Sequence, residues 1–222
     1  MTKIYMVRHC EALGNAMRLF QGSTDLDISD IGAEQLKYLT KRFSNIKLDK
    51  IYTSPLIRAQ KTAHAICDQM ELNPIISDGL KELSGGIVEG KPFKEAFNSI
   101  PGLADIWDNR PQDFFPEGGE AMRDAYERIW KTIKTIAVEN QGKTVACATH
   151  GGVIRCLNCR LLKGNIEELK NIPWAENTAV SLIEFDNNLK PTIIFLNDFS
   201  HLPESLVPKR SRLSSYMKGE NK

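Results

Sequence analysis

Short apolar runs separated by stretches of helical spacing dominate the hydrophobic pattern of this chain. The runs cover residues 4–7, 48–53, 143–149, 179–185 and 192–196. Runs of this length, rich in β-branched residues and bounded by turn residues, are typical of buried strands. The pair Ile75-Ile76, which follows Asn73-Pro74, predicts one more short strand at the edge of a sheet.

Helical spacing fills the gaps between these runs. Apolar residues at 31, 36, 39 and 43 predict an amphipathic helix that ends near Asn45, with Ser29 as its N-cap. Pro55 is well placed in the first turn of a second helix, which continues to about residue 70. Residues 121–138 and 152–162 predict two further helices, and Asp186 begins a predicted hairpin turn between the last two strands.

Strands that alternate with helices predict an α/β fold, with helices on both faces of a mainly parallel sheet. We expect a single domain over residues 1–208, followed by a polar tail at 209–222 that is frayed rather than a binding arm. Residues 84–119 differ because glycine, proline and aromatic residues are frequent there. We interpret them as loops and short helices that cover the strand ends. Their aromatic residues either carry specificity or form a small satellite core.

Composition narrows the classes of function. The 222 residues carry a formal net charge of +1 and no long basic face, which argues against nucleic acid as a partner. No apolar run approaches the roughly 20 residues of a membrane helix, and the N-terminal run is too short for a signal peptide. The five scattered cysteines are an odd number and favour a reduced, cytoplasmic protein. A homodimer is left open.

Residues with phosphate chemistry stand where the predicted strands end. Arg8-His9 follows the first strand, His150-Gly151-Gly152 follows the strand at 143–149, and Ser54-Pro55 leads into the helix that carries Arg58. Glu82 lies in a loop just before a glycine pair. Each group alone has a structural interpretation as a turn cap or a satisfied polar residue. A parallel sheet, however, would gather all of them along one edge, where ligands of open α/β sheets bind.

In this order and spacing, the motifs resemble those of the histidine phosphatase superfamily, which includes cofactor-dependent phosphoglycerate mutase. The matching segments are Arg8-His9-x-Glu11-x-x-x-Asn15, Gln21-Gly22, Ser54-Pro55-Leu56-x-Arg58, Glu82, Glu89-Gly90, Gly118-Gly119-Glu120, His150-Gly151-Gly152 and Asn177-Thr178. The resemblance covers nearly the whole chain. It implies a three-layer α/β/α sandwich with one antiparallel edge strand, and a small phosphate ester as the ligand.

The residues fit metal-independent hydrolysis of a phosphomonoester. Arg8 and Arg58 can each hold phosphate as a fork, and His9 can attack phosphorus through a neutral ring nitrogen to give a phosphohistidine. We expect a backbone carbonyl to fix the other ring nitrogen of His9. His150 would donate to a phosphate oxygen. Glu82 is the candidate proton donor, a role that the resemblance also implies.

Further residues are expected to bind the substrate or to compete for these roles. Asn15 and the N–H groups near Gly151 would donate to the phosphate, and the resemblance adds Gln21 and Gly22. Glu11 and Glu89 are the alternatives to Glu82 as the acid. We expect no cofactor. The spacing of Cys156 and Cys159 matches half a zinc site, but without a second pair we interpret both as helix neighbours that face the core.

One departure from the family pattern lies beside the nucleophile, where Cys10 stands in place of the usual glycine. Two nearby arginines could lower the pKa of its thiol, so one hypothesis is that oxidation of Cys10 inactivates the enzyme. The alternative is an inert side chain turned into the core.

Three functions fit these residues: a phosphatase, a phosphoglycerate mutase and a phosphate-ligand-binding protein without turnover. Typical mutases carry an Arg-His-Tyr run after the acid, where this chain has Leu83-Ser84-Gly85. This difference favours the phosphatase. Sugar phosphates, nucleotide-loop phosphates and phosphoserine all fit as substrates.

Overall fold

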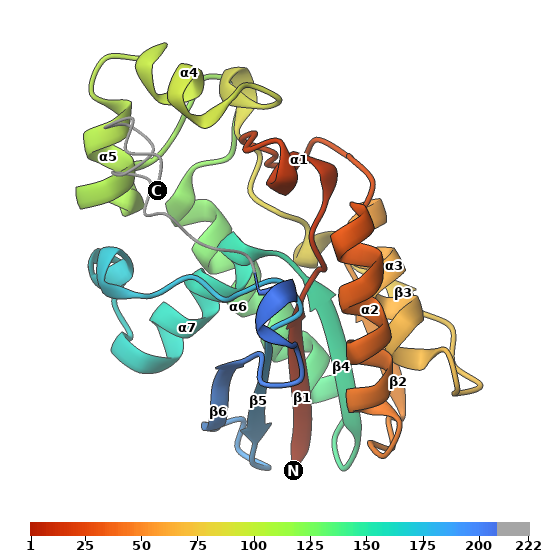
Figure 1. The fold of residues 1–222 in the computed structure, drawn as a ribbon. Coiled ribbons are helices and arrows are strands. Elements are labelled where there is room, and N and C mark those ends of the chain that lie inside the picture. The colour runs from red at the N-terminus through yellow and green to blue at the C-terminus, as the bar shows by residue number, and fades with distance from the viewer. Residues whose placement is uncertain (208–222) are drawn as a thin grey trace.

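The computed structural model describes residues 1–207, and the predicted tail at 209–222 lies outside them. The strands are β1 (Thr2–Arg8), β2 (Lys50–Thr53), β3 (Ile75–Ile76), β4 (Thr144–Thr149), β5 (Val180–Phe185) and β6 (Pro191–Asp198) (Figure 1). The helices are α1 (Leu13–Ala16), α2 (Asp30–Phe43), α3 (Ile57–Cys67), α4 (Phe93–Asn98), α5 (Leu103–Asn109), α6 (Met122–Glu139) and α7 (Gly151–Lys163).

The strands form one sheet in the order β3-β2-β4-β1-β5-β6. Neighbours from β3 to β1 pair in parallel, whereas β5 is antiparallel to both β1 and β6. The mainly parallel α/β prediction is therefore confirmed. One detail differs: the strand that opposes the others, β5, lies one place in from the edge. The turn at Asp186 returns the chain as the outermost strand β6, with the Asp186 N–H donating to the carbonyl of Lys190 at 3.1 Å.

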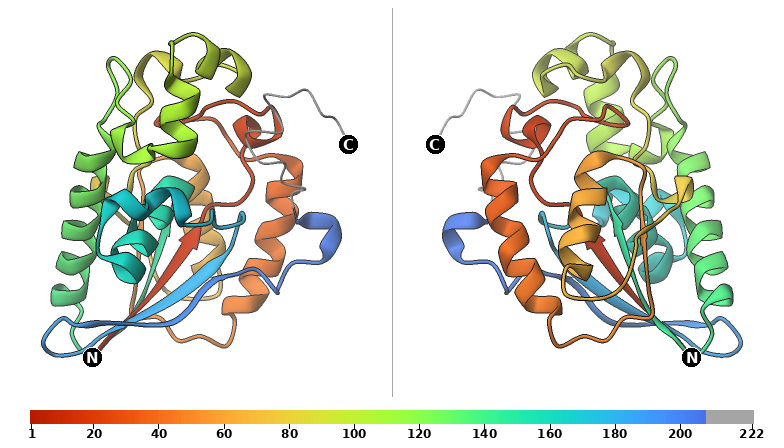
Figure 2. Two further views of the ribbon diagram at one scale, coloured as in Figure 1. Left: turned by 90° about the vertical axis from the view of Figure 1, so that its left-hand side faces the viewer. Right: turned by 90° about the vertical axis from the view of Figure 1, so that its right-hand side faces the viewer.

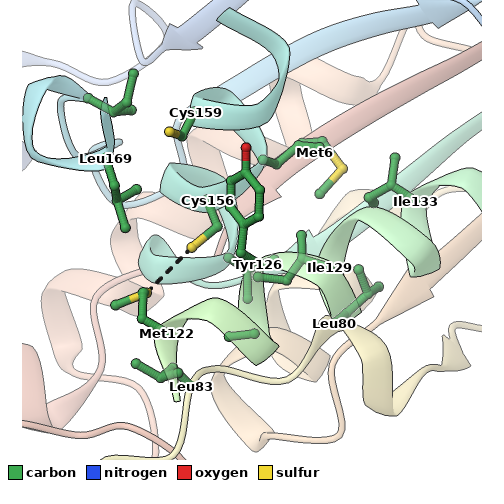
Figure 3. Close-up of a cluster of buried hydrophobic side chains, with 14 of the residues drawn as sticks. Met6, Leu80, Leu83, Met122, Tyr126, Ile129, Ile133, Cys156, Cys159 and Leu169 are labelled. Atoms are coloured by element: carbon green, nitrogen blue, oxygen red, sulfur yellow. Dashed lines mark hydrogen bonds between the residues drawn. The ribbon is translucent and has the colours of Figure 1, made fainter. Parts of the chain in front are cut away.

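Helices cover both faces of the sheet, α2 and α3 on one side and α6 and α7 on the other (Figure 1). The alternation of side chains along β1 supplies both cores, because successive residues of a strand point to opposite faces. Ile4 and Met6 belong to the core under α6 and α7, and Val7 belongs to the core under α2 and α3. Figure 3 shows part of the first core, where Met6 packs near Tyr126 of α6 and Cys156 of α7.

Helix boundaries mostly follow the sequence signals. Ser29 caps α2 as predicted, with its Oγ accepting a hydrogen bond from the Gly32 N–H at 3.0 Å. The second helix, α3, starts at Ile57 rather than in the turn that contains Pro55. The reason is local: Ser54 Oγ accepts a hydrogen bond from the Leu56 N–H at 3.3 Å and holds these residues in a turn before the helix. Within residues 1–207, no helix is both long and apolar enough to cross a bilayer.

The segment 84–119 lies beyond the carboxyl ends of the strands, with α4 and α5 outermost (Figures 1 and 2). It is tied to the loop after α1 through Phe20, whose N–H donates to Lys91 O at 2.9 Å and whose carbonyl accepts from the Gly90 N–H at 2.8 Å. This arrangement encloses the end of the sheet at which the first and fourth strands stop.

Candidate active site

His9 follows directly after β1 and is 3% exposed. Its Nδ1 lies 2.6 Å from the carbonyl oxygen of Cys10. A carbonyl only accepts, so Nδ1 must carry the proton, and Nε2 is then left with a lone pair. Burial, followed by the charges of Arg58 and Arg8, lowers the pKa of His9 well below its ordinary value. The ring is therefore neutral and has the tautomer that a nucleophile requires.

His150 follows directly after β4 and lies against His9, with ring centroids 5.1 Å apart. Its Nε2 is 2.7 Å from Ser54 Oγ, and its buried Nδ1 has no hydrogen-bond partner among the described residues. Burial and then the charge of Arg58 lower the pKa of His150 well below its ordinary value. His150 does not itself line the pocket described below. It packs against the ring of His9 as a neutral, fully buried ring.

Arg8 and Arg58 both reach the pocket, one from the end of β1 and the other from α3. Arg58 is 1% exposed, and its Nη1 and Nη2 donate to the carbonyls of Thr24 and Gly22 at 2.7 and 2.8 Å. Arg8 Nη1 donates to Ala175 O at 2.6 Å. These bonds fix two guanidinium groups beside the neutral His9 ring. The wall therefore has a net positive charge suited to an anion.

Glu82 lies in the same pocket, and backbone donors hold its carboxylate. Its Oε1 accepts from the Leu83 N–H and its Oε2 from the Gly152 N–H, both at 3.0 Å. The N–H groups near Gly151 were expected to donate to the phosphate. At Gly152 this expectation is wrong, because that N–H at the start of α7 donates to Glu82.

The two alternative acids lie elsewhere. Glu11 is buried away from the pocket, and its Oε1 accepts from Ser29 Oγ at 2.7 Å. Burial alone would raise the pKa of Glu89, but hydrogen bonds from Ser23, Gly85 and Thr24 lower it overall. Glu89 is thus an ionised carboxylate with its acceptors occupied, which joins the Gly22 loop to the start of the segment 84–119. Neither residue is positioned as a proton donor.

The remaining predicted substrate-binding residues, Asn15, Gln21, Gly22 and Gly151, all line the same pocket. The Oδ1 of Asn15 accepts from the Ala12 N–H at 3.0 Å, so its amide group is the end that can donate to an anion. Gln21 is 8% exposed, and its buried Oε1 has no hydrogen-bond partner within the described part of the chain. Gly22 has φ +50°, a backbone conformation that side chains rarely adopt.

The pocket has a volume of about 620 Å³ when the open solvent at its mouth is counted, and much of its wall is apolar. Phe93 and Trp107 of the aromatic-rich segment line it, whereas Phe97 and Phe114 are buried in the main core and Phe115 is 68% exposed. A role of the pocket-lining members in specificity stays a prediction, and the buried members belong to the main core rather than to a satellite core. The sequence did not single out Trp174, Phe20 or Met122 as pocket walls. The only feature in the sequence that could have marked these three residues as pocket walls was their large apolar side chains.

Cys10 does not have the environment that the oxidation hypothesis requires. Its side chain is fully buried, and burial raises the pKa of the thiol to about 12. The hypothesis of a pKa lowered by nearby arginines is wrong, because desolvation is the dominant cause at this position and outweighs the hydrogen bond with Thr62 and the charge of Lys61. Cys156 and Cys159 also face the core: Cys156 Sγ contacts Met122 Sδ at 3.6 Å (Figure 3), and Cys159 Sγ contacts Asn165 O. Within residues 1–207, no cluster of three or more histidine, cysteine or carboxylate residues could hold a metal.

Comparisons with known proteins agree with this geometry. The family described as "Histidine phosphatase superfamily (branch 1)" matches residues 4–198. The curated protein "Phosphoserine phosphatase 1" of Hydrogenobacter thermophilus is 29% identical over 207 residues, which cover 93% of this chain and 97% of that protein.

Two solved structures extend the likeness to three dimensions. Bacillus stearothermophilus YhfR superposes with a TM-score of 0.85 at 30% identity, over 90% of this chain and 99% of that one. A phosphoserine phosphatase from Entamoeba histolytica, solved with 3-phosphoglyceric acid, superposes with a TM-score of 0.80 at 25% identity, over 91% of this chain and 100% of that one.

Proposed function

Because the chain belongs to the histidine phosphatase superfamily, we propose that it hydrolyses small phosphomonoesters through a phosphohistidine formed on His9. The observation that carries the proposal is the contact between His9 Nδ1 and the Cys10 carbonyl at 2.6 Å. It fixes the neutral tautomer whose Nε2 lone pair is nucleophilic, in a pocket that also holds Arg8 and Arg58.

In the first step, the Nε2 lone pair of His9 forms a bond to phosphorus and the bond from phosphorus to the leaving oxygen breaks. Glu82, in its protonated form, gives that oxygen a proton, so an alcohol departs. Arg8 and Arg58 hold the equatorial oxygens and stabilise the charge in the transition state. Asn15, which lines the pocket, would add a hydrogen bond to the same oxygens, and His150 would donate from Nδ1, its ring nitrogen without a partner among the described residues.

In the second step, water attacks the phosphohistidine and the Glu82 carboxylate takes its proton. The bond from phosphorus to nitrogen breaks, and its electron pair returns to Nε2. The cycle thus ends with inorganic phosphate, neutral His9 and protonated Glu82. Hydrolysis, rather than transfer to a second hydroxyl, is favoured because Leu83 is a buried pocket residue at the place where typical mutases carry an arginine.

An assay with p-nitrophenyl phosphate tests the proposal, with His9→Ala as the inactive variant. We expect its kcat/KM to fall by more than about 1,000-fold, and an alkaline quench of wild type with substrate to trap phosphohistidine. The matched control is His64→Ala, because His64 is an exposed histidine on α3. Hydrolysis that persists in His9→Ala would contradict the mechanism. A coupled 3-phosphoglycerate assay primed with bisphosphoglycerate detects a mutase.

We place this activity in the cytoplasm. All five cysteines are unpaired and buried, which supports a reducing compartment.

A further inference from the structure

We propose that the leaving-group half of this pocket takes an uncharged apolar group, an aromatic ring above all, and discriminates against esters whose alcohol carries a carboxylate. The inference rests on the proposed phosphatase function and specifies its substrate class. It depends on two observations: which charged groups line the pocket, and which side chains form the rest of its wall.

The charges of the pocket are concentrated at the phosphate end. Among the described residues that line it, Arg8 and Arg58 are the cationic ones and Glu82 is the one carboxylate. Arg58 is directed at the Gly22 loop by its bonds to the carbonyls of Thr24 and Gly22. In the proposed reaction both arginines would bind the phosphate group. A second anionic group on the substrate would find no counter-ion among these lining residues and would lie near Glu82.

A further arginine stands close to the wall but is not available to the ligand. Arg155 lies 4.8 Å from the centre of the Trp174 ring, and it does not line the pocket. It is 6% exposed, and its Nε and Nη2 donate to the carbonyls of Ile172 and Leu169 at 2.9 Å. Its role is to support Trp174 from within the fold, so it cannot neutralise a substrate carboxylate.

Apolar side chains form much of the rest of the pocket wall. They are Leu19, Phe20, Leu83, Phe93, Trp107, Met122 and Trp174. Leu83 and Met122 connect this wall to the main core (Figure 3). Such a surface gains free energy by contact with apolar atoms of a ligand and offers a charged group no hydrogen bonds in return.

The aromatic members of the wall hold one another in place. The rings of Trp107 and Trp174 are stacked, with centroids 5.8 Å apart and planes inclined by 24°. Phe20 packs edge-on against Trp107 at 5.5 Å, and Phe114 packs edge-on against Trp107 at 4.8 Å. These contacts order the wall before any ligand arrives. A flat ring can therefore bind without a large cost of ordering side chains.

Phosphoserine is the informative contrast, because curated relatives carry its name. Its carboxylate would have no cationic partner among the described lining residues other than the two arginines that hold the phosphate, and the one carboxylate that its ammonium could pair with there is Glu82, the group proposed to deliver the proton. An ester such as 2-phenylethyl phosphate keeps a primary alkoxide as the leaving group but replaces both charges by a ring. Comparing these two esters therefore measures the preference of the pocket, because the chemical step is of similar difficulty for both.

The test measures kcat/KM for 2-phenylethyl phosphate and O-phospho-L-serine with the wild-type protein. We expect the aromatic ester to be preferred by on the order of 100-fold. Trp107→Ala and Trp174→Ala should each reduce that preference by about 10-fold. Phe115→Ala, which removes an exposed aromatic of the same segment, should leave it unchanged. Equal rates, or a preference for phosphoserine, would overturn the inference while leaving the phosphatase proposal intact.

A binding measurement separates the two proposals. His9→Ala, which should not turn over, is titrated with each ester and followed by tryptophan fluorescence or calorimetry. Tighter binding of the aromatic ester supports the inference even if the wild type hydrolyses nothing. A wild type that hydrolyses nothing would contradict only the proposed function. Tighter binding of phosphoserine contradicts the inference whatever the turnover.

Discussion

The N–H of Gly152, at the start of α7, donates a hydrogen bond of 3.0 Å to the Glu82 carboxylate. The contact joins the end of β4, which carries His150, to the loop that carries the proposed acid. It also leaves no room for a side chain: a Cβ at residue 152 would lie 2.6 Å from Glu82 Oε1. The glycine after His150-Gly151 thus sets where the carboxylate rests.

Replacing this glycine should impair proton delivery while the fold is retained. We expect Gly152→Ala to push the Glu82 side chain aside and to lower kcat/KM, which reports the first phosphoryl transfer, by about 100-fold for an alkyl phosphate, as Glu82→Gln should. The loss should be much smaller with p-nitrophenyl phosphate, because p-nitrophenolate departs without needing a proton. Steady-state kinetics with both esters checks this. Equal losses on the two esters would show that Gly152 acts through something other than the acid.

Arg128 of α6 should hold the loop that carries Glu82. Its Nη1 donates to the carbonyls of Gly79 and Lys81 at 2.9 and 3.1 Å, and its Nε and Nη2 form a fork on Glu120, both at 2.7 Å. Lysine cannot make this set of bonds. We therefore expect Arg128→Lys to lower the free energy of unfolding by about 1–2 kcal/mol and to reduce kcat more than it changes KM.

Urea denaturation and steady-state kinetics measure both effects. The matched control is Arg123→Lys on the same helix, where Arg123 is half exposed and pairs with Asp113 and Glu167 at the surface. Exposed pairs of this kind contribute little, so the control should change stability by less than about 0.5 kcal/mol. If the two variants behave alike, the loop is held by other contacts.

The sequence predicted which residues come together at the site, because their positions at the strand ends depend on local sequence signals. Three apolar runs, 4–7, 48–53 and 143–149, end at the residue where a polar motif begins, as at Val7 before Arg8-His9 and at Thr149 before His150. Parallel pairing then brings the strand ends to one edge. The backbone acceptor expected for His9 is also found, because a buried imidazole N–H needs a partner.

What the sequence could not supply depends on packing between distant segments. Trp174 becomes a pocket wall only because residues 84–119 bring Trp107 against it. The sequence suggested that nearby arginines would govern the Cys10 thiol, but the extent of burial decides its pKa, and burial is a property of the fold. The place of β5 one strand in from the edge likewise follows from pairing that no local pattern encodes.

Acid should destabilise the protein through its two buried active-site histidines. The pKa of His9 and of His150 is lowered in the folded state, so below about pH 6.5 the unfolded chain binds more protons than the folded one. The contribution of the two neutral histidines to the free energy of unfolding is therefore complete above that pH and is lost as the pH falls. Each histidine should add a slope of up to about 1.4 kcal/mol per pH unit.

Urea titrations between pH 7 and pH 5 measure this slope. His9→Asn and His150→Asn should each flatten it, and His64→Gln, which changes an exposed histidine, should not. The variants are compared by the slope of the free energy of unfolding against pH, because the asparagine substitutions also change the absolute stability. A wild-type slope retained by both asparagine variants would mean that other groups cause the acid sensitivity. His201 is a further contributor, since burial lowers its pKa to about 4.

Cys10 should be chemically inert despite its place beside the nucleophile. Peroxide and alkylating reagents react with the thiolate, and a buried thiol with a pKa of about 12 has almost none at neutral pH. We expect wild type and Cys10→Ser to lose phosphatase activity at the same rate in peroxide. We also expect iodoacetamide to label none of the five buried thiols until urea unfolds the protein. Faster inactivation of the wild type than of Cys10→Ser would instead show that the site opens often enough to ionise this thiol, and would restore the oxidation hypothesis.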